Sequence, residues 1–146
     1  MTNALLQKPI PLPAEADRPY WDALKEHRLV LYRCSACGWY SQRPKMFCQE
    51  CLGEDFEWSE VSGKGRIYGF TRVHQTWVAA FREETPYVLV SVALDEQPSL
   101  VLVTNLLGEF DFDDLDIDLP VIADFEPRGD EMLLQFRLQG DNDVQS

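Results

Sequence analysis

The sequence contains no long hydrophobic run. Hydrophobic residues make up 45% of its 146 positions, yet no apolar stretch reaches the ~18 residues that a membrane-spanning helix needs. Residues 1–19 also lack the basic-then-apolar layout of a secretion signal. We therefore expect a cytoplasmic protein with no membrane partner.

Residues suited to catalysis are scarce as well. The chain has two histidines, His27 and His74, and no serine-nucleophile elbow, P-loop or dinucleotide-binding glycine motif. A lone histidine in a strand pattern, such as His74, is more often packed or at the surface than a general base. All four cysteines lie within residues 34–51, which leaves none as a nucleophile. These absences favour a binding or scaffolding module over an autonomous enzyme.

Positive charge is nearly absent from the second part of the chain. Residues 1–82 hold 11 Lys/Arg and 9 Asp/Glu, whereas residues 83–146 hold 2 and 16, which accounts for the net charge of -12. A segment with a net charge of -14 repels phosphate backbones, so nucleic acid is a disfavoured partner. The other interpretation is that the acidity serves solubility alone.

The cysteines form the strongest motif, CSACGWYSQRPKMFCQEC, which holds two Cys-x-x-Cys pairs with ten residues between them. Two intervening residues let both thiolates of a pair face one ion about 2.3 Å away. Four thiolates close a tetrahedral shell and leave no open position for chemistry. We therefore expect one structural Zn²⁺ per chain, with iron as the alternative for a four-cysteine site. The predicted ligands are Cys34, Cys37, Cys48 and Cys51.

The N-terminal part predicts an arm and a helix. Residues 1–18 are proline-rich and read as an extended arm. A short helix is expected over residues 19–28, with Pro19 in its first turn. About ten residues are too few for independent stability. Its aromatic pair, Tyr20 and Trp21, must therefore pack either on the chain's own core or on a partner subunit.

The sequence that follows the helix predicts mainly β-structure. One strand leads into the first cysteine pair, and five more, separated by turns and one acidic link over residues 109–118, match the size of an OB-fold barrel. A β-sandwich fragment is the alternative. The fold class is thus mainly β, with an N-terminal helix, a four-cysteine zinc ribbon and a five-stranded OB-fold barrel. Strands are expected over residues 29–33, 66–74, 85–95, 99–107, 119–127 and 131–139, and the domains over residues 1–18 (arm), 19–60 (helix plus zinc ribbon), 61–139 (barrel) and 140–146 (polar tail).

This order of elements resembles a known family. PYWDALKEHRLVLYRCSACGWYSQRP, the second pair CQEC and the strand GKGRIYGFTRVH are similar to OB-fold proteins with a rubredoxin-like zinc ribbon, a family long filed as domain of unknown function thirty-five. The resemblance covers roughly residues 18–139. It implies an accessory subunit that associates with a thiolase-fold chain acting on acyl-CoA, as does the small subunit of benzoylsuccinyl-CoA thiolase or the partner of a steroid side-chain aldolase.

By that resemblance the catalytic residues would lie on the partner, and this chain would stabilise a hetero-oligomer and border the CoA channel. Basic groups suit the phosphates of CoA, and the ribbon would display an aromatic surface to the partner. The main alternative is a nucleic-acid module in which Tyr68 and Phe70 stack bases; an autonomous acyl-CoA enzyme is the third. The expected CoA contacts are Lys64, Arg66, Arg72 and Arg82, and the expected partner contacts are Tyr20, Trp21, Trp39, Tyr40, Met46 and Phe47.

Overall fold

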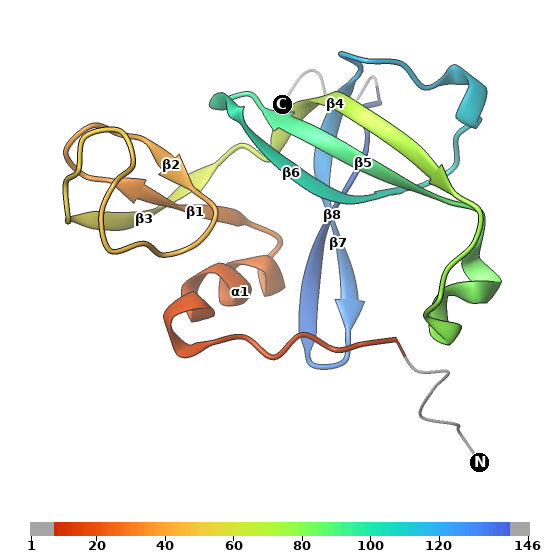
Figure 1. Cartoon of the computed structure of the whole chain (residues 1–146), viewed down its shortest axis with the longest axis horizontal. Coiled ribbons are helices and arrows are strands. Elements are labelled where there is room, and N and C mark those ends of the chain that lie inside the picture. Colours follow the sequence, from red (N-terminus) through yellow and green to blue (C-terminus); the bar gives the residue numbers. More distant parts are fainter. Residues whose placement is uncertain (1–7, 141–146) are drawn as a thin grey trace.

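A computed structural model of the chain describes residues 8–140. These residues form a small three-stranded sheet next to a five-stranded closed barrel, with one helix beneath the junction (Figure 1). The elements are η2 (Glu15–Asp17), α1 (Arg18–Lys25), β1 (Leu29–Cys34), β2 (Tyr40–Ser41), β3 (Phe56–Val61), β4 (Lys64–Val73), η3 (Ala79–Glu84), β5 (Tyr87–Leu94), β6 (Gln97–Leu107), η4 (Phe112–Asp114), β7 (Pro120–Arg128) and β8 (Glu131–Leu138).

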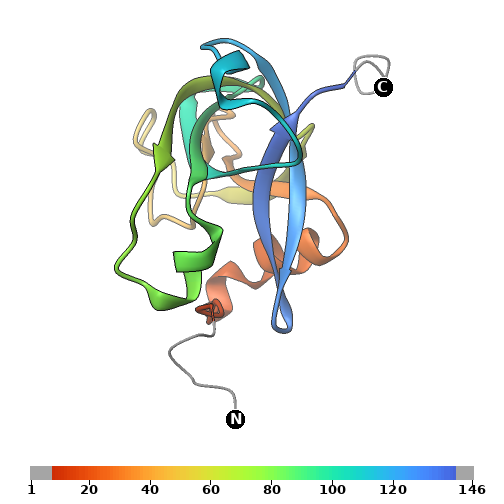
Figure 2. The ribbon, with the colours of Figure 1, turned by 90° about the vertical axis from the view of Figure 1, so that its right-hand side faces the viewer.

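The barrel confirms the predicted OB-fold. Its strands follow the order β4-β5-β6-β8-β7, and β7 pairs back onto β4 to close the ring (Figure 2). β6 and β8 run parallel through Leu106 and Phe136, whereas the other neighbours are antiparallel. A closed five-stranded ring of this kind is an OB-fold barrel. The β-sandwich alternative is therefore wrong.

Alternation along the strands builds the barrel core. Every second residue of β5 is buried, and these side chains meet inward residues of the other strands. The acidic link between β6 and β7 also contributes, because Leu115 is buried and Phe110 and Phe112 pack against the same core. Its carboxylates are exposed, while these three apolar residues hold the link on the barrel. The core includes Ile67, Val88, Val90, Val92, Leu94, Leu102, Leu106, Val121 and Phe136.

The three-stranded sheet has the order β2-β1-β3. β3 was not among the strands expected from the sequence, where residues 52–60 read as an acidic, aromatic exit from the metal motif. In the structure Phe56 and Trp58 pack against Tyr32 of β1, with ring centroids 4.6 and 5.0 Å apart. These cross-strand aromatic contacts stabilise a pairing that the local pattern does not reveal.

The helix ends three residues earlier than expected. α1 stops at Lys25 because His27 adopts a left-handed backbone (φ 60°), and the N–H groups of Glu26 and Arg28 both bond to the carbonyl of Ala23. The His27 ring then stacks on Phe125 of β7 at 4.7 Å. With eight residues α1 is the longest helix among residues 8–140, and none of the helices described could cross a bilayer.

An ion-pair network attaches α1 to the β7–β8 hairpin. The carboxylate of Glu131 accepts a hydrogen bond from Arg18 at 3.0 Å, and its other oxygen lies 3.4 Å from Lys25. The bond from Arg18 lowers the pKa of Glu131 below its usual range. Tyr20 and Trp21 pack against the chain's own core on the same side. The docked helix thus has its aromatic pair partly buried within the subunit.

The arm crosses the hairpin tip. Arg128 donates to the carbonyl of Pro9 at 3.1 Å, Lys8 pairs with Glu84 of η3, and Ile10 lies against Gly129. The arm therefore connects the end of β7 to η3. Parts of two predicted segments, residues 1–7 of the arm and 141–146 of the tail, lie outside the described residues.

Candidate metal centre and partner surfaces

Two near-identical turns present the cysteines. In the first, the N–H of Cys34 bonds to the carbonyl of Trp39, and in the second the N–H of Cys48 bonds to Gly53 in the same way. Each turn has a left-handed residue four positions after its first cysteine, Gly38 (φ 82°) and Leu52 (φ 64°). Glycine is expected at such a position and leucine is not.

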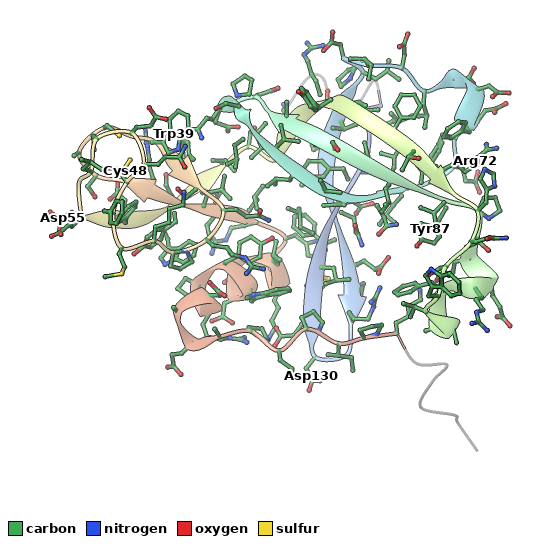
Figure 3. All side chains as sticks on the ribbon, in the orientation of Figure 1. Trp39, Cys48, Asp55, Arg72, Tyr87 and Asp130 are labelled. Atoms are coloured by element: carbon green, nitrogen blue, oxygen red, sulfur yellow. The ribbon has the colours of Figure 1, made fainter. Side chains whose placement is uncertain are left out.

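The four predicted ligands lie together at one end of the molecule, where Figure 3 labels Cys48. Their sulfur atoms are within 4.8 Å of one another, and the pairs Cys34–Cys51 and Cys37–Cys48 are 3.6 Å apart. That separation is far longer than a disulfide bond. It is close to the ~3.8 Å between ligands in a tetrahedron with metal–sulfur bonds of about 2.3 Å. The geometry fits one four-coordinate metal ion.

Thiol electrostatics favour the same conclusion. Backbone N–H groups of Cys37 and Ala36 lower the pKa of Cys34 to about 7 despite its burial. A backbone N–H of Trp39 lowers the pKa of Cys37, but burial and the neighbouring sulfurs outweigh it and raise that pKa to about 12. With this raised pKa the Cys37 thiol keeps its proton near neutral pH, and binding of a metal ion would displace that proton.

The residues expected to contact a partner divide into two groups. In the first group, Trp39 lines a cavity between the ribbon and the barrel. The ring of Tyr40 lies under the guanidinium of Arg33. Tyr40, Tyr20 and Trp21 all pack against the hydrophobic core. Met46 (87% exposed) and Phe47 stand out at the ribbon tip, together with Leu52. Partner contact by these residues stays a prediction, which Met46 and Phe47 fit most simply.

The four expected CoA contacts do not form one cluster. Lys64 and Arg66 begin β4 and Arg72 lies near its end, so Lys64 and Arg72 are separated by roughly 25 Å of strand. The Arg72 guanidinium lies 4.1 Å from the centroid of the Phe112 ring. Arg82 belongs to η3, beyond the end of β4. One phosphate group cannot contact all four side chains.

The 74–86 loop, which connects β4 to β5, contains a feature that sequence reasoning missed. Trp77 is 97% exposed and lines a cavity of about 450 Å³ with His74 and Arg82. Figure 3 shows this loop beyond Arg72 and Tyr87, at the opposite end of the molecule from the ribbon. The signal available in the sequence was an apolar run, TWVAAF, in a stretch with no strand pattern.

Comparison with known proteins covers both parts of the chain. Residues 21–57 match a family model described as ChsH2, rubredoxin-like zinc ribbon domain, and residues 58–126 match ChsH2, C-terminal OB-fold domain. The solved structure of the Ltp2-ChsH2(DUF35) aldolase is similar with a TM-score of 0.75 and 32% identity, over 88% of this chain and 98% of that chain. The chain belongs to the DUF35 family. The family resemblance expected from the sequence is confirmed.

Longer relatives carry DUF35 sequence as well. A probable enoyl-CoA hydratase alpha subunit of Thermomonospora curvata is 36% identical over 126 residues, which are 85% of this chain and 38% of the relative. The benzoylsuccinyl-CoA thiolase subunit BbsA of Geobacter metallireducens is 32% identical over 80 residues, 55% of this chain and 51% of BbsA. The chain described here thus spans about half or less of the length of these two relatives.

The two left-handed turn residues give a test of the metal centre. Replacing Leu52 with glycine should remove a backbone penalty of about 1 kcal/mol and tighten metal binding about fivefold. Gly38→Ala, the matched change in the first turn, should weaken binding by a similar factor. Competition with a chromogenic chelator measures both. Weaker binding by the Leu52→Gly variant would show that the leucine side chain, not its φ angle, governs the turn.

Proposed function

We propose that this DUF35 chain is a non-catalytic accessory subunit of a thiolase-fold enzyme complex that makes or breaks a C–C bond of an acyl-CoA. The observation that carries the proposal is the 32% identity that extends over 98% of the DUF35 chain in the Ltp2-ChsH2 aldolase. The similarity to BbsA, a subunit of a thiolase, supports the same class of partner. The role is to stabilise that partner in a hetero-oligomer.

The arrangement of reactive residues supports a non-catalytic role. All four cysteines belong to the metal cluster. His27 stacks on Phe125 beside the helix, whereas His74 lines the cavity of the 74–86 loop, so the two histidines serve different parts of the molecule. The hydrogen bonds of the cysteine side chains within residues 8–140 involve no histidine, so no cysteine–histidine nucleophile–base pair is formed there.

The metal is best taken as Zn²⁺. Four thiolates occupy all positions of a tetrahedral ion, as in structural zinc sites, and the matched family model is a zinc ribbon. Metal analysis of the purified protein should find one zinc per chain, and removal with a chelator should unfold the ribbon while the barrel keeps its β-signal. Iron with a red colour would contradict this assignment.

The partner is tested by co-expression. Expressed together with a thiolase-fold chain encoded beside it, this protein should elute as a stable complex that cleaves or forms the C–C bond. The DUF35 chain alone should show little activity, because the reacting groups lie on the partner. Size-exclusion chromatography and a turnover assay measure the two effects. Separate elution under all conditions, with full activity in the larger chain, would refute the proposal.

CoA contact is proposed at the 74–86 loop only. Arg82 lines the cavity of this loop, and the exposed ring of Trp77 offers a flat surface on which an adenine can stack. Arg72 precedes the loop near the end of β4, where its guanidinium lies over the Phe112 ring, and is the second cation proposed to reach the phosphates. Reversing both arginine charges should weaken acyl-CoA binding to the complex about tenfold. The matched control reverses Lys64 and Arg66 and should leave the affinity within about twofold. Equal losses in both variants would contradict this placement.

The nucleic-acid alternative gains no support from the barrel surface. Of the two aromatics expected to stack bases, Phe70 packs edge-on against Phe112 at 5.6 Å and against the core. Of these two aromatics only Tyr68 is exposed.

A further inference from the structure

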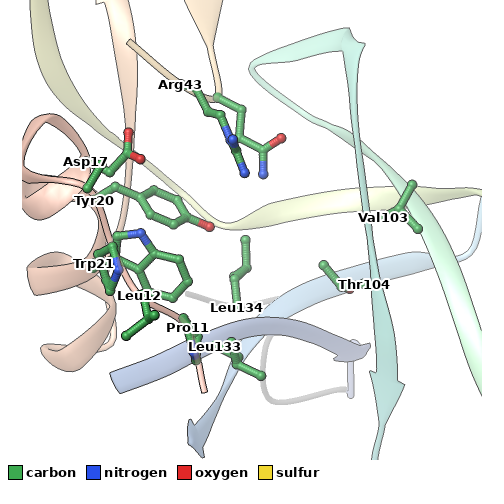
Figure 4. A pocket seen from close by; sticks show the side chains of 13 residues that line it. Pro11, Leu12, Asp17, Tyr20, Trp21, Arg43, Val103, Thr104, Leu133 and Leu134 are labelled. Atoms are coloured by element: carbon green, nitrogen blue, oxygen red, sulfur yellow. The ribbon is translucent and has the colours of Figure 1, made fainter. Parts of the chain in front are cut away.

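The barrel has a seam that is only partly closed. β6 pairs with β8 through Leu106 and Leu107 alone. The preceding residues of β6, from Val101 to Asn105, pair with β5 on one side. On their other side lies a cavity of about 550 Å³, lined by Val103 and Thr104 of β6 and by Leu133 and Leu134 of β8 (Figure 4).

Backbone groups of β6 face this cavity. The N–H of Asn105 points away from β5, because it donates to the side chain of Gln135 in β8 at 2.8 Å. Backbone groups alternate between the two sides of a strand in an antiparallel ladder, and the register from Val101 to Asn105 has no bulge. Val101 and Val103 must therefore present their N–H and C=O groups to the same side as Asn105. No strand pairs with them there among residues 8–140.

The opposite wall supplies apolar surface and a cation. Trp21 and Tyr20 of α1 line it, and Leu12 of the arm, which is 95% exposed, lies beside them. In Figure 4 the Tyr20 hydroxyl and the Arg43 guanidinium both point into the space between the walls. Burial raises the pKa of Tyr20 above its usual range, so this hydroxyl stays protonated as a donor.

Arg43 differs from the other cations near the arm and helix. Arg18, Lys25 and Arg28 each lie within 4.0 Å of a carboxylate. Arg43 has no such partner within the described chain, although Asp17 lines the same cavity. It also lines a second cavity of about 370 Å³, together with Trp39 and Lys45 of the ribbon. The cations available in this groove suit an acidic occupant.

We propose that an extended segment of the partner subunit adds to β6 as a further strand along this seam. Its backbone pairs with Val101 and Val103, alternate apolar side chains pack against Trp21 and Leu133, and a carboxylate meets Arg43. An unpaired strand edge is a template for such addition, and flanking pockets select the side chains. A small anionic molecule would satisfy Arg43 but leave the backbone edge unpaired. The identity of the partner rests on the proposed function.

Proline at position 103 provides the test. Val103→Pro removes one N–H that points away from β5, and proline is tolerated where the N–H of an edge residue faces solvent. The matched control, Val103→Ala, keeps that N–H and removes more of the side chain. In the purified complex we expect Val103→Pro to weaken association about tenfold and Val103→Ala by less than threefold. Each variant is first compared with the wild type by melting temperature and zinc content.

Hydrogen exchange on the wild type keeps the proposal testable if the proline variant does not fold. The amides of Val101 and Val103 should exchange more slowly in the complex than in the isolated chain, while those on exposed loops should not change. A complex that forms without this protection, or with equal affinity for both variants, overturns the inference and leaves the proposed function standing. Failure of the wild type to form a complex overturns both. Protection that appears in the isolated chain on concentration would assign the edge to a second copy and overturn the inference.

Discussion

Sulfur coordination is the constraint on which the ribbon part of the molecule depends. Between β1 and β3, residues 35–55 bury only Ser41 and Cys48, so apolar burial cannot hold this loop in shape. Metal binding supplies folding free energy in such cases. The cluster also joins the end of β1 to the segment before β3, whose pairing begins at Cys34 and Phe56. Since only Ser62 and Gly63 separate β3 from β4, that register also determines where the chain enters the barrel.

Local sequence patterns were sufficient to predict the metal ligands and most of the barrel strands. The cysteine spacing predicted the four clustered ligands, and the alternation of β5 and β7 predicted their place in a closed barrel. Features set by distant contacts were missed or displaced. β3 depends on the stacking of Phe56 and Trp58 on Tyr32, and α1 ends at a left-handed His27 whose ring stacks on Phe125. The 74–86 loop gave no periodic signal. The short β6–β8 pairing joins residues about 30 positions apart in the chain, so no local pattern encodes it.

The surfaces proposed for function lie on different parts of the fold. The ribbon lies at one end of the molecule and the 74–86 loop at the other, and the seam beside β6 lies between the barrel and α1. The ribbon carries the exposed Met46 and Phe47, and the loop carries the exposed Trp77. These surfaces adjoin the cysteine cluster, the ends of β4 and β5, and the barrel wall, respectively. An arrangement of this kind suits a subunit that lies along a larger protein and supports it at several points.

The side chain of Gln97 has a wider consequence for how the molecule behaves among other proteins. Its amide accepts from the N–H of Tyr40 and donates to the carbonyl of Tyr40, both at 2.9 Å, as the backbone of a neighbouring strand would. The outer edge of β2 is thereby capped within the molecule, and exposed strand edges are the sites at which chains mispair and aggregate. At β2 the ribbon therefore offers no free backbone template for fibre growth, although apolar side chains nearby are exposed.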